Sequence, residues 1–215
     1  MKILSHRGYW KTSEEKNTLL AFERSFSLGF GTETDVRDLD GKLVISHDVP
    51  LSANTPILFS DFLKCYKSFN NDLPLAINIK SDGLQLMLKQ ELEQFDISNY
   101  FVFDMSVPDT IGYLNSGLKV FGRESEYETN VSFYSNILGV WMDEFEGHWI
   151  NENKVKGHLE NGKLVCIVSP DLHKRNHLEE WADYKKIESQ NLNYQENIWI
   201  CTDFPEEART FFYED

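Results

Sequence analysis

Short apolar, β-branched runs alternate with segments of helical spacing, and this alternation constrains the fold more than any other feature of the sequence. Between the runs, residues such as Leu19, Phe22 and Phe26 recur at three- or four-residue steps, which places them on one face of a helix. Strand followed by helix, repeated, favours parallel pairing of the strands. Eight runs follow this rhythm: Ile3–His6, Thr32–Val36, Leu75–Lys80, Tyr100–Met105, Lys119–Arg123, Leu138–Asp143, Leu164–Ser169 and Ile198–Asp203.

The length agrees with this pattern, since 215 residues divided among eight βα units gives about 27 per unit, near the lower limit for a (β/α)8 barrel. We therefore predict an α/β protein with a compact TIM-barrel fold. No linker rich in Pro, Gly or Ser interrupts the rhythm, which predicts a single domain over residues 1–215. After the second strand, the turn signal Asp40-Gly41 and the alternating run 43–47 predict a hairpin-like excursion.

Composition limits the partners and the location of the protein. A hydrophobic content of 41% is ample for a buried core. The 21 Lys and Arg against 35 Asp and Glu give a net charge of −14, which disfavours nucleic acids and anionic membranes as partners. No apolar stretch suits a signal peptide or a transmembrane helix, which predicts a cytoplasmic protein without integral membrane association. The sequence does not indicate an oligomeric state. Three cysteines without C-x-x-C spacing are expected to be buried thiols: Cys65, Cys166 and Cys201.

Polar residues follow or end the apolar runs, and in a (β/α)8 fold the carboxyl ends of the strands carry the reaction site. Because side chains alternate along a strand, Glu33 and Asp35 share one side, as do Asn78 and Lys80. We expect both pairs to point inward. The full set is His6, Arg7, Glu33, Asp35, Asn78, Lys80, Arg123, Glu124, Asp143, Ser169 and Asp203.

The pair Glu33 and Asp35 suggests a cation. Two carboxylates in a water-poor site repel each other and raise one pKa unless a cation neutralises them. Carboxylate and amide oxygens favour Mg²⁺ or Ca²⁺, and no Cys/His cluster has the spacing of a zinc site. The alternative for this pair is a solvated strand face, or a salt bridge to Arg7 or Lys80.

Two histidines, His6 and His47, each end an extended run beside a charged residue, Arg7 and Asp48 respectively. Imidazole titrates near neutral pH, so two of them on opposite sides of a phosphorus atom can serve as base and acid. Core or surface roles are expected for the other four histidines, which are His148, His158, His173 and His177.

Several short elements occur in a fixed order over about the first 50 residues: His6-Arg7-Gly8, Asn17–Phe22, Glu33-Thr34-Asp35-Val36, Asp40-Gly41 and Val44–Asp48. Their order and spacing resemble the signature of the glycerophosphodiester phosphodiesterase family. The resemblance implies a phosphoric diester hydrolase of lipid metabolism on a TIM barrel. It further implies that His6 and His47 are the catalytic pair, that Glu33 and Asp35 bind a divalent cation, and that Arg7 contacts the substrate phosphate. Lys80 is expected to contact the phosphate as well, with an ion pair to Glu33 or Asp35 as the alternative.

Two positions depart from the family pattern. Ile77-Asn78-Ile79-Lys80 stands where the family has a motif like I-E-I-K. The Asn78 amide still offers a carbonyl oxygen, so it remains a candidate metal ligand, with Asp82 or Glu15 as possible compensating carboxylates. Lys16 stands in Glu15-Lys16-Asn17-Thr18 where the family commonly has P-E-N-T. Glu15 either stands in for that acidic residue or forms a capping box with Thr12.

The sequence thus predicts a metal-dependent phosphodiesterase that hydrolyses a small glycerophosphodiester-like substrate. The attacking group on phosphorus is water or the substrate's own neighbouring hydroxyl. Arg123, Asp143 and Ser169 are candidates for recognising the alcohol part of the substrate. Two alternatives stay open. One is a catalytically silent barrel that binds a phosphorylated ligand or partner, which Asn78 and Lys16 would favour. The other is a glycosidase that uses a pair of carboxylates.

Overall fold

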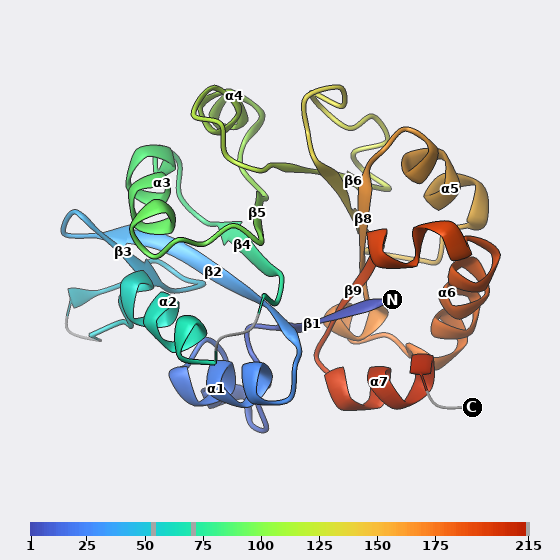
Figure 1. Ribbon diagram of the computed structural model, residues 1–215, viewed down its shortest axis with the longest axis horizontal. Coiled ribbons are helices and arrows are strands. Elements are labelled where there is room, and N and C mark those ends of the chain that lie inside the picture. Colours follow the sequence, from blue (N-terminus) through green and yellow to red (C-terminus); the bar gives the residue numbers. More distant parts are fainter. Residues whose placement is uncertain (53–54, 70–71, 214–215) are drawn as a thin grey trace. The chain divides into compact units, whose positions relative to one another are not determined.

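The strands of the protein form one mainly parallel sheet in the computed structural model, which describes residues 1–52, 55–69 and 72–213 (Figure 1). The strand order in the described residues is β5-β4-β2-β1-β9-β8-β7-β6, with β3 paired to β2 beside this path. Eight strands in this order, with helices in the described part of the chain between all successive pairs of them except β6 and β7, confirm the predicted (β/α)8 fold class. The strands are β1 Lys2–His6, β2 Gly31–Leu39, β3 Lys42–Ile45, β4 Leu75–Ile79, β5 Tyr100–Phe103, β6 Phe121–Ser125, β7 Gly139–Asp143, β8 Leu164–Val168 and β9 Ile198–Thr202.

The chain divides into two compact units. The N-terminal unit is Ser5–Val120, and the C-terminal unit is Met1–Leu4 together with the chain from Phe121 onward. The single domain over residues 1–215 stays a prediction.

In the N-terminal unit, β4 pairs in parallel with both β2 and β5, and Asp35 lies opposite Asn78 in the register. Every residue of β4 is buried, which explains why its sequence is a continuous apolar run interrupted only by Asn78. Helices α1 and α2 lie next to each other beside this part of the sheet, with Phe22 and Phe62 in edge contact (Figure 1). The helices are α1 Leu19–Ser27, α2 Phe59–Ser68, α3 Gln85–Gln94 and α4 Val107–Asn115, and Ser13–Glu15 forms the 3-10 turn η1.

The start of α1 differs from the predicted capping box. Thr18 caps the helix, since its hydroxyl accepts a hydrogen bond from the backbone N–H of Ala21 at 3.4 Å. Glu15 instead accepts from the N–H of Lys11 at 2.8 Å and pairs with Arg24 at 2.7 Å. The Thr12–Glu15 capping box is therefore wrong, because the helix begins one turn later and its packing brings Arg24 to the carboxylate.

The predicted excursion after the second strand is a β-hairpin. Strand β3 pairs antiparallel with β2, from Leu39 opposite Lys42 to Val36 opposite Ile45. Asp40 and Gly41 have φ values of 49° and 74°, the left-handed pair that a tight type I′ turn requires. The return strand brings His47 back along β2, where its carbonyl oxygen accepts from Nε of Arg37 at 3.0 Å.

The C-terminal unit contains the parallel strands β6, β7, β8 and β9, and in Figure 1 its helices lie on one side of β8 and β9. Trp181 and Tyr184, both in the helix Leu178–Gln190, are fully buried. Cys166 and Cys201 are buried as predicted, whereas Cys65 of the other unit is only partly buried. The remaining elements are α5 Glu152–Glu160, α6 Leu178–Gln190, α7 Pro205–Tyr213, and the 3-10 turns η3 Pro170–His173 and η4 Leu192–Asn197.

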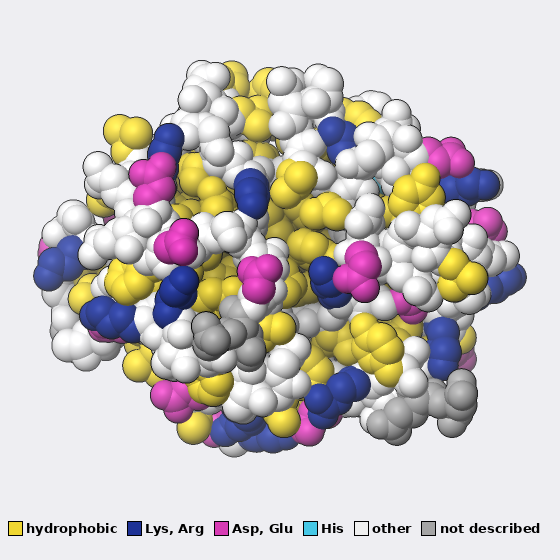
Figure 2. All heavy atoms as spheres, viewed as in Figure 1, with side chains coloured by type: hydrophobic (Ala, Val, Ile, Leu, Met, Phe, Trp, Pro, Cys, Tyr) yellow, Lys and Arg dark blue, Asp and Glu magenta, His cyan; other side chains and the backbone are white. Residues whose placement is uncertain are grey.

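The surface carries both signs of charge. On the face drawn in Figure 2, Lys and Arg side chains are interspersed with Asp and Glu, so the net charge of −14 is not gathered there into one acidic patch. Among the described residues, no helix has the length and apolar character needed to span a bilayer.

Candidate functional site

The backbone turns sharply after β1, and the turn holds Arg7 against two carboxylates of β2. Arg7 and Gly8 have φ values of 57° and 81°. The Arg7 N–H donates to Oε2 of Glu33 at 3.1 Å, and its Nε lies 2.9 Å from Oδ2 of Asp35. Gly8 is required at its position, because an added Cβ would lie 2.8 Å from Cβ of Ala21.

Glu33 and Asp35 are buried, with residue exposures of 1% and 0%, which rules out a solvated strand face for this pair. Burial, and then the nearby charge of Asp35, raise the pKa of Glu33 to about 7, and the positive charges of Arg7 and Lys80 only partly oppose this shift. Both carboxylates contact Arg7, an arrangement that a pair of glycosidase carboxylates does not require, so it does not favour a glycosidase.

Asn78 of β4 places an amide oxygen beside Asp35. The residue is 7% exposed, and its Oδ1 is buried with no hydrogen-bond partner among the described residues. Oδ1 of Asp35 is likewise without a hydrogen bond there, although Nζ of Lys80 lies 3.5 Å from it. Two orphaned oxygens on neighbouring strands, with Glu33 close by, are the donor types that Mg²⁺ and Ca²⁺ prefer. These residues therefore fit a hard divalent cation.

Asp104 is a further carboxylate of this cluster, which the sequence did not identify. It follows β5 directly with φ of 69°, and its Oδ2 lies 3.8 Å from Nζ of Lys80. The two carboxylates expected to compensate for Asn78 have other partners, since Glu15 pairs with Arg24 and Asp82 accepts from Ser106 at 3.3 Å. The position of Asp104 immediately after an apolar run was the signal that could have revealed it.

Asn17 orients Asp35. Its Nδ2 donates to Oδ2 of Asp35 at 2.9 Å, its Oδ1 accepts from the Thr34 hydroxyl at 3.0 Å, and its N–H donates to the Arg7 carbonyl at 2.9 Å. These three bonds fix the turn after β1 to the side chains of β2, so the carboxylate is held in one orientation before any ligand arrives.

The two histidines lie in different surroundings. Nε2 of His6 is 4.0 Å from Oε2 of Glu33, and the His6 side chain is only 15% exposed. His47 is on the hairpin, where its Nδ1 lies 2.9 Å from Oδ1 of Asp48 and its side chain is 45% exposed. The structure thus brings His6 to the carboxylates, whereas His47 lines a cavity that Arg7 also lines.

That cavity, which we call the hairpin cavity, has a volume of about 390 Å³. Arg7 belongs both to its wall and to the ion pair with Asp35, so one residue is common to the lining around His47 and to the carboxylate cluster. Its polar lining includes Arg7, Lys16, Asn17, Ser46, His47 and Asp48.

The three candidates for alcohol recognition belong to the C-terminal unit. Arg123 pairs with Glu128 and lies 5.8 Å from the ring centre of Phe145. Asp143 ends β7, and its Oδ1 is 2.6 Å from Nε2 of His173, so it orients that imidazole. Ser169 is fully buried.

The Ser169 hydroxyl has an internal role that leaves it unsuited to a ligand. It accepts from Nε1 of Trp181 at 2.8 Å and donates to Asp171. Burial raises the pKa of Asp171, and the hydrogen bonds from Ser169 and the Asp203 N–H oppose that shift. These bonds hold η3 against β8 and β9.

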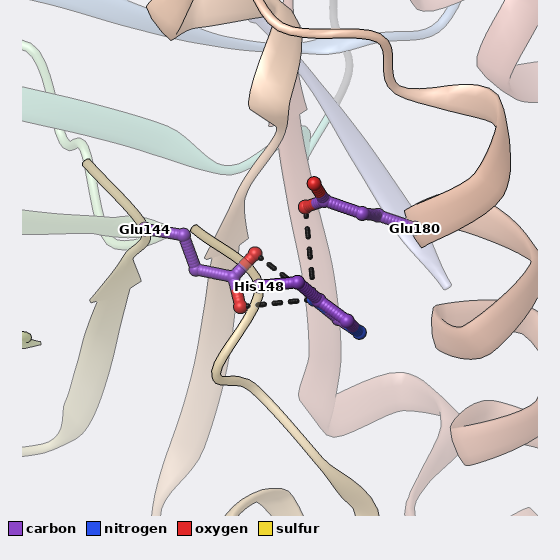
Figure 3. A group of neighbouring side chains, drawn as sticks. All are labelled: Glu144, His148 and Glu180. Atoms are coloured by element: carbon purple, nitrogen blue, oxygen red, sulfur yellow. Dashed lines mark hydrogen bonds and ion pairs between the residues drawn. The ribbon is translucent and has the colours of Figure 1, made fainter. Parts of the chain in front are cut away.

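A second cluster of possible metal ligands also lies in the C-terminal unit. Figure 3 shows Glu144, His148 and Glu180, whose ligand atoms all lie within 4.8 Å of one another. Nδ1 of His148 is 3.1 Å from Oε1 of Glu144 and 3.6 Å from Oε2 of Glu180. No spacing pattern predicts this group, because the two glutamates are 36 positions apart in the sequence.

These two carboxylates already have a positively charged partner, the guanidinium of Arg175. Arg175 lies 3.8 Å from Oε2 of Glu144 and pairs with Glu180. Glu144 is fully buried and also accepts from the N–H groups of Trp149 and Ile150 and from the hydroxyl of Tyr184. The cluster is therefore complete as an anchor for the loop after β7, and a metal ion there would have to compete with these bonds.

Comparison with known proteins identifies solved structures that have a similar fold. No protein-family model and no curated protein matches the sequence. A candidate glycerophosphodiester phosphodiesterase of Galdieria sulphuraria is 17% identical, with a TM-score of 0.77, over 98% of this chain and 97% of that one. The glycerophosphodiester phosphodiesterase of Agrobacterium tumefaciens is 14% identical, with a TM-score of 0.67, over 99% and 98% of the two chains.

A phosphodiesterase of Oleispira antarctica, solved with its product sn-glycerol-3-phosphate, is 15% identical, with a TM-score of 0.67, over 98% of this chain and 96% of that one. These likenesses extend over nearly the whole chain, well beyond the first 50 residues that carry the sequence resemblance. In its fold, the protein is similar to the glycerophosphodiester phosphodiesterases.

Proposed function

We propose that the protein is a metal-dependent phosphodiesterase that hydrolyses glycerophosphodiester-like substrates. The observation that carries the proposal is the buried cluster in which Arg7 contacts Glu33 and Asp35 while Asn78 and Asp35 present oxygens without hydrogen bonds. An arginine beside orphaned oxygen donors suits a phosphate bound together with a hard cation.

Each residue of the cluster has a role in this proposal. Glu33, Asp35 and Asn78 hold the divalent cation, Mg²⁺ or Ca²⁺, which when bound offsets the charge of the carboxylates and of the phosphate. Arg7 and Lys80 contact the phosphate oxygens. Their ion pairs with Asp35 keep both cations positioned before the substrate binds.

Proton transfer is assigned to His6 and His47. One takes the proton of the attacking hydroxyl, and the other protonates the leaving alkoxide. The short path from His6 to Glu33 and the shared cavity of His47 and Arg7 support this pair. Support also comes from the Oleispira antarctica phosphodiesterase, which has sn-glycerol-3-phosphate bound as its product on the same fold.

Other parts of the assignment remain predictions. Arg123 and Asp143 are proposed to recognise an alcohol part of the substrate, since Arg123 lies in β6 and Asp143 ends β7, and the reaction site of a (β/α)8 fold lies at the carboxyl ends of its strands. A role in lipid metabolism, a cytoplasmic location and the absence of nucleic-acid partners stay predictions from the sequence.

A silent barrel that binds a phosphorylated ligand is the second candidate, favoured by the charges of the cluster. Arg7 and Lys80 already pair with Asp35, Lys80 also lies near Asp104, and burial raises the pKa of Glu33 to about 7, so the two cations offset much of the negative charge of the cluster without a metal ion. In that case, phosphate esters would stabilise the fold without turnover.

The test is turnover of glycerophosphoethanolamine and of a chromogenic phosphodiester by purified protein with Mg²⁺, Ca²⁺ or EDTA. We expect activity with a divalent cation, and a loss of roughly 10²–10⁴-fold in kcat for His6→Ala and for His47→Ala. His177→Ala is the matched control, because that imidazole pairs with Glu207 on the C-terminal unit. Full activity in both variants would overturn the proposal, and thermal stabilisation without turnover would favour the silent barrel.

A further inference from the structure

Lys16 stands where the resemblance leads one to expect an acidic residue, and the structure places it in the wall of the hairpin cavity. Its Nζ lies 4.2 Å from the ring centre of Trp10. Trp10 is itself fixed, because its Nε1 donates to the His6 carbonyl at 3.2 Å. The ammonium is thus held over an indole ring at the cavity wall, instead of extending freely into solvent.

The charges that line the hairpin cavity are predominantly positive. Arg7 and Lys16 contribute two positive charges to the lining and Asp48 one negative charge, and because Arg7 also pairs with Asp35, the positive charge of the cavity rests mainly on Lys16. Asp48 points largely to solvent, with a side chain 95% exposed, and lies against His47. This local excess contrasts with the net charge of −14 for the whole chain.

The nearest acidic residues in the sequence do not reverse this balance. Glu15 is turned toward Arg24 and the N–H of Lys11, and Glu14 accepts from the hydroxyl of Ser13 at 3.0 Å. Neither glutamate lines the cavity. A basic hollow in an acidic protein attracts anionic ligands and repels cationic ones.

We propose that the hairpin cavity binds an anionic group on the alcohol part of the substrate, and that Lys16 is the residue that selects for it. Arg7 is shared between the cavity and the carboxylate cluster, so a phosphate held at Arg7 leaves the rest of the substrate beside Lys16 and His47. The inference rests on the proposed function and narrows it to phosphodiesters whose alcohol carries a carboxylate or a further phosphate.

Glycerophosphoserine and glycerophosphoethanolamine test this directly, because they differ by a single carboxylate. We expect the wild-type protein to prefer glycerophosphoserine. Lys16→Gln should reduce the ratio of kcat/KM for glycerophosphoserine to that for glycerophosphoethanolamine roughly tenfold. The change should lie mainly in KM, because the variant loses one charge-assisted hydrogen bond to the substrate. Lys16→Glu, which restores the acidic residue, should reverse the preference.

Lys11→Gln is the control, because Lys11 is an exposed lysine of the same segment that lies outside the cavity wall. Its preference should equal that of the wild type. An unchanged ratio between the two substrates in both Lys16 variants would overturn the inference.

A binding experiment separates this inference from the proposed function. Calorimetry of both compounds in EDTA, without turnover, should show tighter binding of glycerophosphoserine to the wild type and loss of that difference in Lys16→Gln. If the protein bound with this preference but never turned over either compound with Mg²⁺ or Ca²⁺, the proposed phosphodiesterase activity would be wrong and the proposed selectivity would be right. Equal affinities for the two compounds in the wild type would refute the selectivity alone.

Discussion

The guanidinium Nε of Arg7 lies 2.9 Å from Oδ2 of Asp35, so one ion pair joins the arginine proposed to bind phosphate to the carboxylate proposed to bind the cation. Asp35 is fully buried, and loss of Arg7 would leave its charge poorly compensated. Affinity for the phosphate and affinity for the cation are therefore expected to change together when either residue is replaced.

Asn78 should limit the affinity of the site for divalent cations. Asn78→Asp adds a negative charge beside the buried Oδ1 of Asp35 and is expected to tighten Mg²⁺ or Ca²⁺ binding roughly tenfold, because affinity follows the number of charged ligands. Calorimetric titration with each ion measures the change. The control is Asn153→Asp, which adds the same charge at an exposed position of α5. Equal affinities in the wild type and Asn78→Asp would exclude Asn78 as a ligand.

Gly8 should be among the least replaceable residues of the turn after β1. Gly8→Ala combines φ of 81° with a Cβ only 2.9 Å from the Ala21 carbonyl carbon, and a loss of about 2–4 kcal/mol of unfolding free energy is expected. Gly83→Ala is the comparison, since Gly83 has φ of 85° but no atom within 4 Å of an added Cβ. It should cost about 1 kcal/mol. Urea unfolding of both variants gives the difference, and similar losses would contradict the predicted clash.

Glu124 should contribute stability that disappears in acid. Burial alone would raise the pKa of Glu124, but Lys154 at 2.6 Å and His158 at 2.7 Å outweigh it and lower that pKa below 4.5. A lowered pKa means that the folded protein binds the proton less readily than the unfolded chain does. The stabilisation is therefore present above about pH 4.5 and is lost as the pH falls through the folded-state pKa.

Thermal unfolding of the wild type and Glu124→Gln across pH 3–7 measures this contribution. The difference in Tm should be largest near neutral pH and should shrink in acid. Glu160 forms an exposed pair with Lys156 at 3.9 Å on α5, the helix that carries Lys154 and His158, and Glu160→Gln should show little difference at any pH. A difference for Glu124→Gln that does not vary with pH would contradict the assignment.

Glu144 should matter for stability far more than His148, although both belong to the cluster in Figure 3. Glu144→Ala leaves the Tyr184 hydroxyl and two backbone N–H groups without their carboxylate, and a loss of roughly 3–5 kcal/mol is expected. His148→Ala should cost less than about 1 kcal/mol, because that side chain is 31% exposed. If Zn²⁺ stabilised the wild type but not His148→Ala, the cluster would be a metal site instead of an anchor.

The fold was predictable because its signal is local. A strand buried on both faces reads as an apolar run, and the Asp40-Gly41 turn is a residue pair with a strong conformational preference. The common orientation of Glu33 and Asp35 follows from strand alternation, and both are buried and contact Arg7.

The parts that could not be predicted depend on packing or on unusual backbone angles. Asp104 reaches Lys80 from a left-handed conformation that a residue other than glycine rarely adopts. The partner of Glu15 is set by the packing of α1, which brings Arg24 to it. Glu144 contacts residues from three separate segments of the chain, and no sequence spacing predicts such an arrangement.

The antiparallel pairing of β2 with β3 makes the position of His47 adjustable independently of the barrel strands. A turn longer by one residue would reverse the face of the ribbon on which His47 lies, while the parallel ladder between β2 and β4 would keep Asp35 opposite Asn78. Exchange of residues 40–47, in evolution or by design, can thus give the same fold a new acid–base group while the parallel strands of the sheet keep their register.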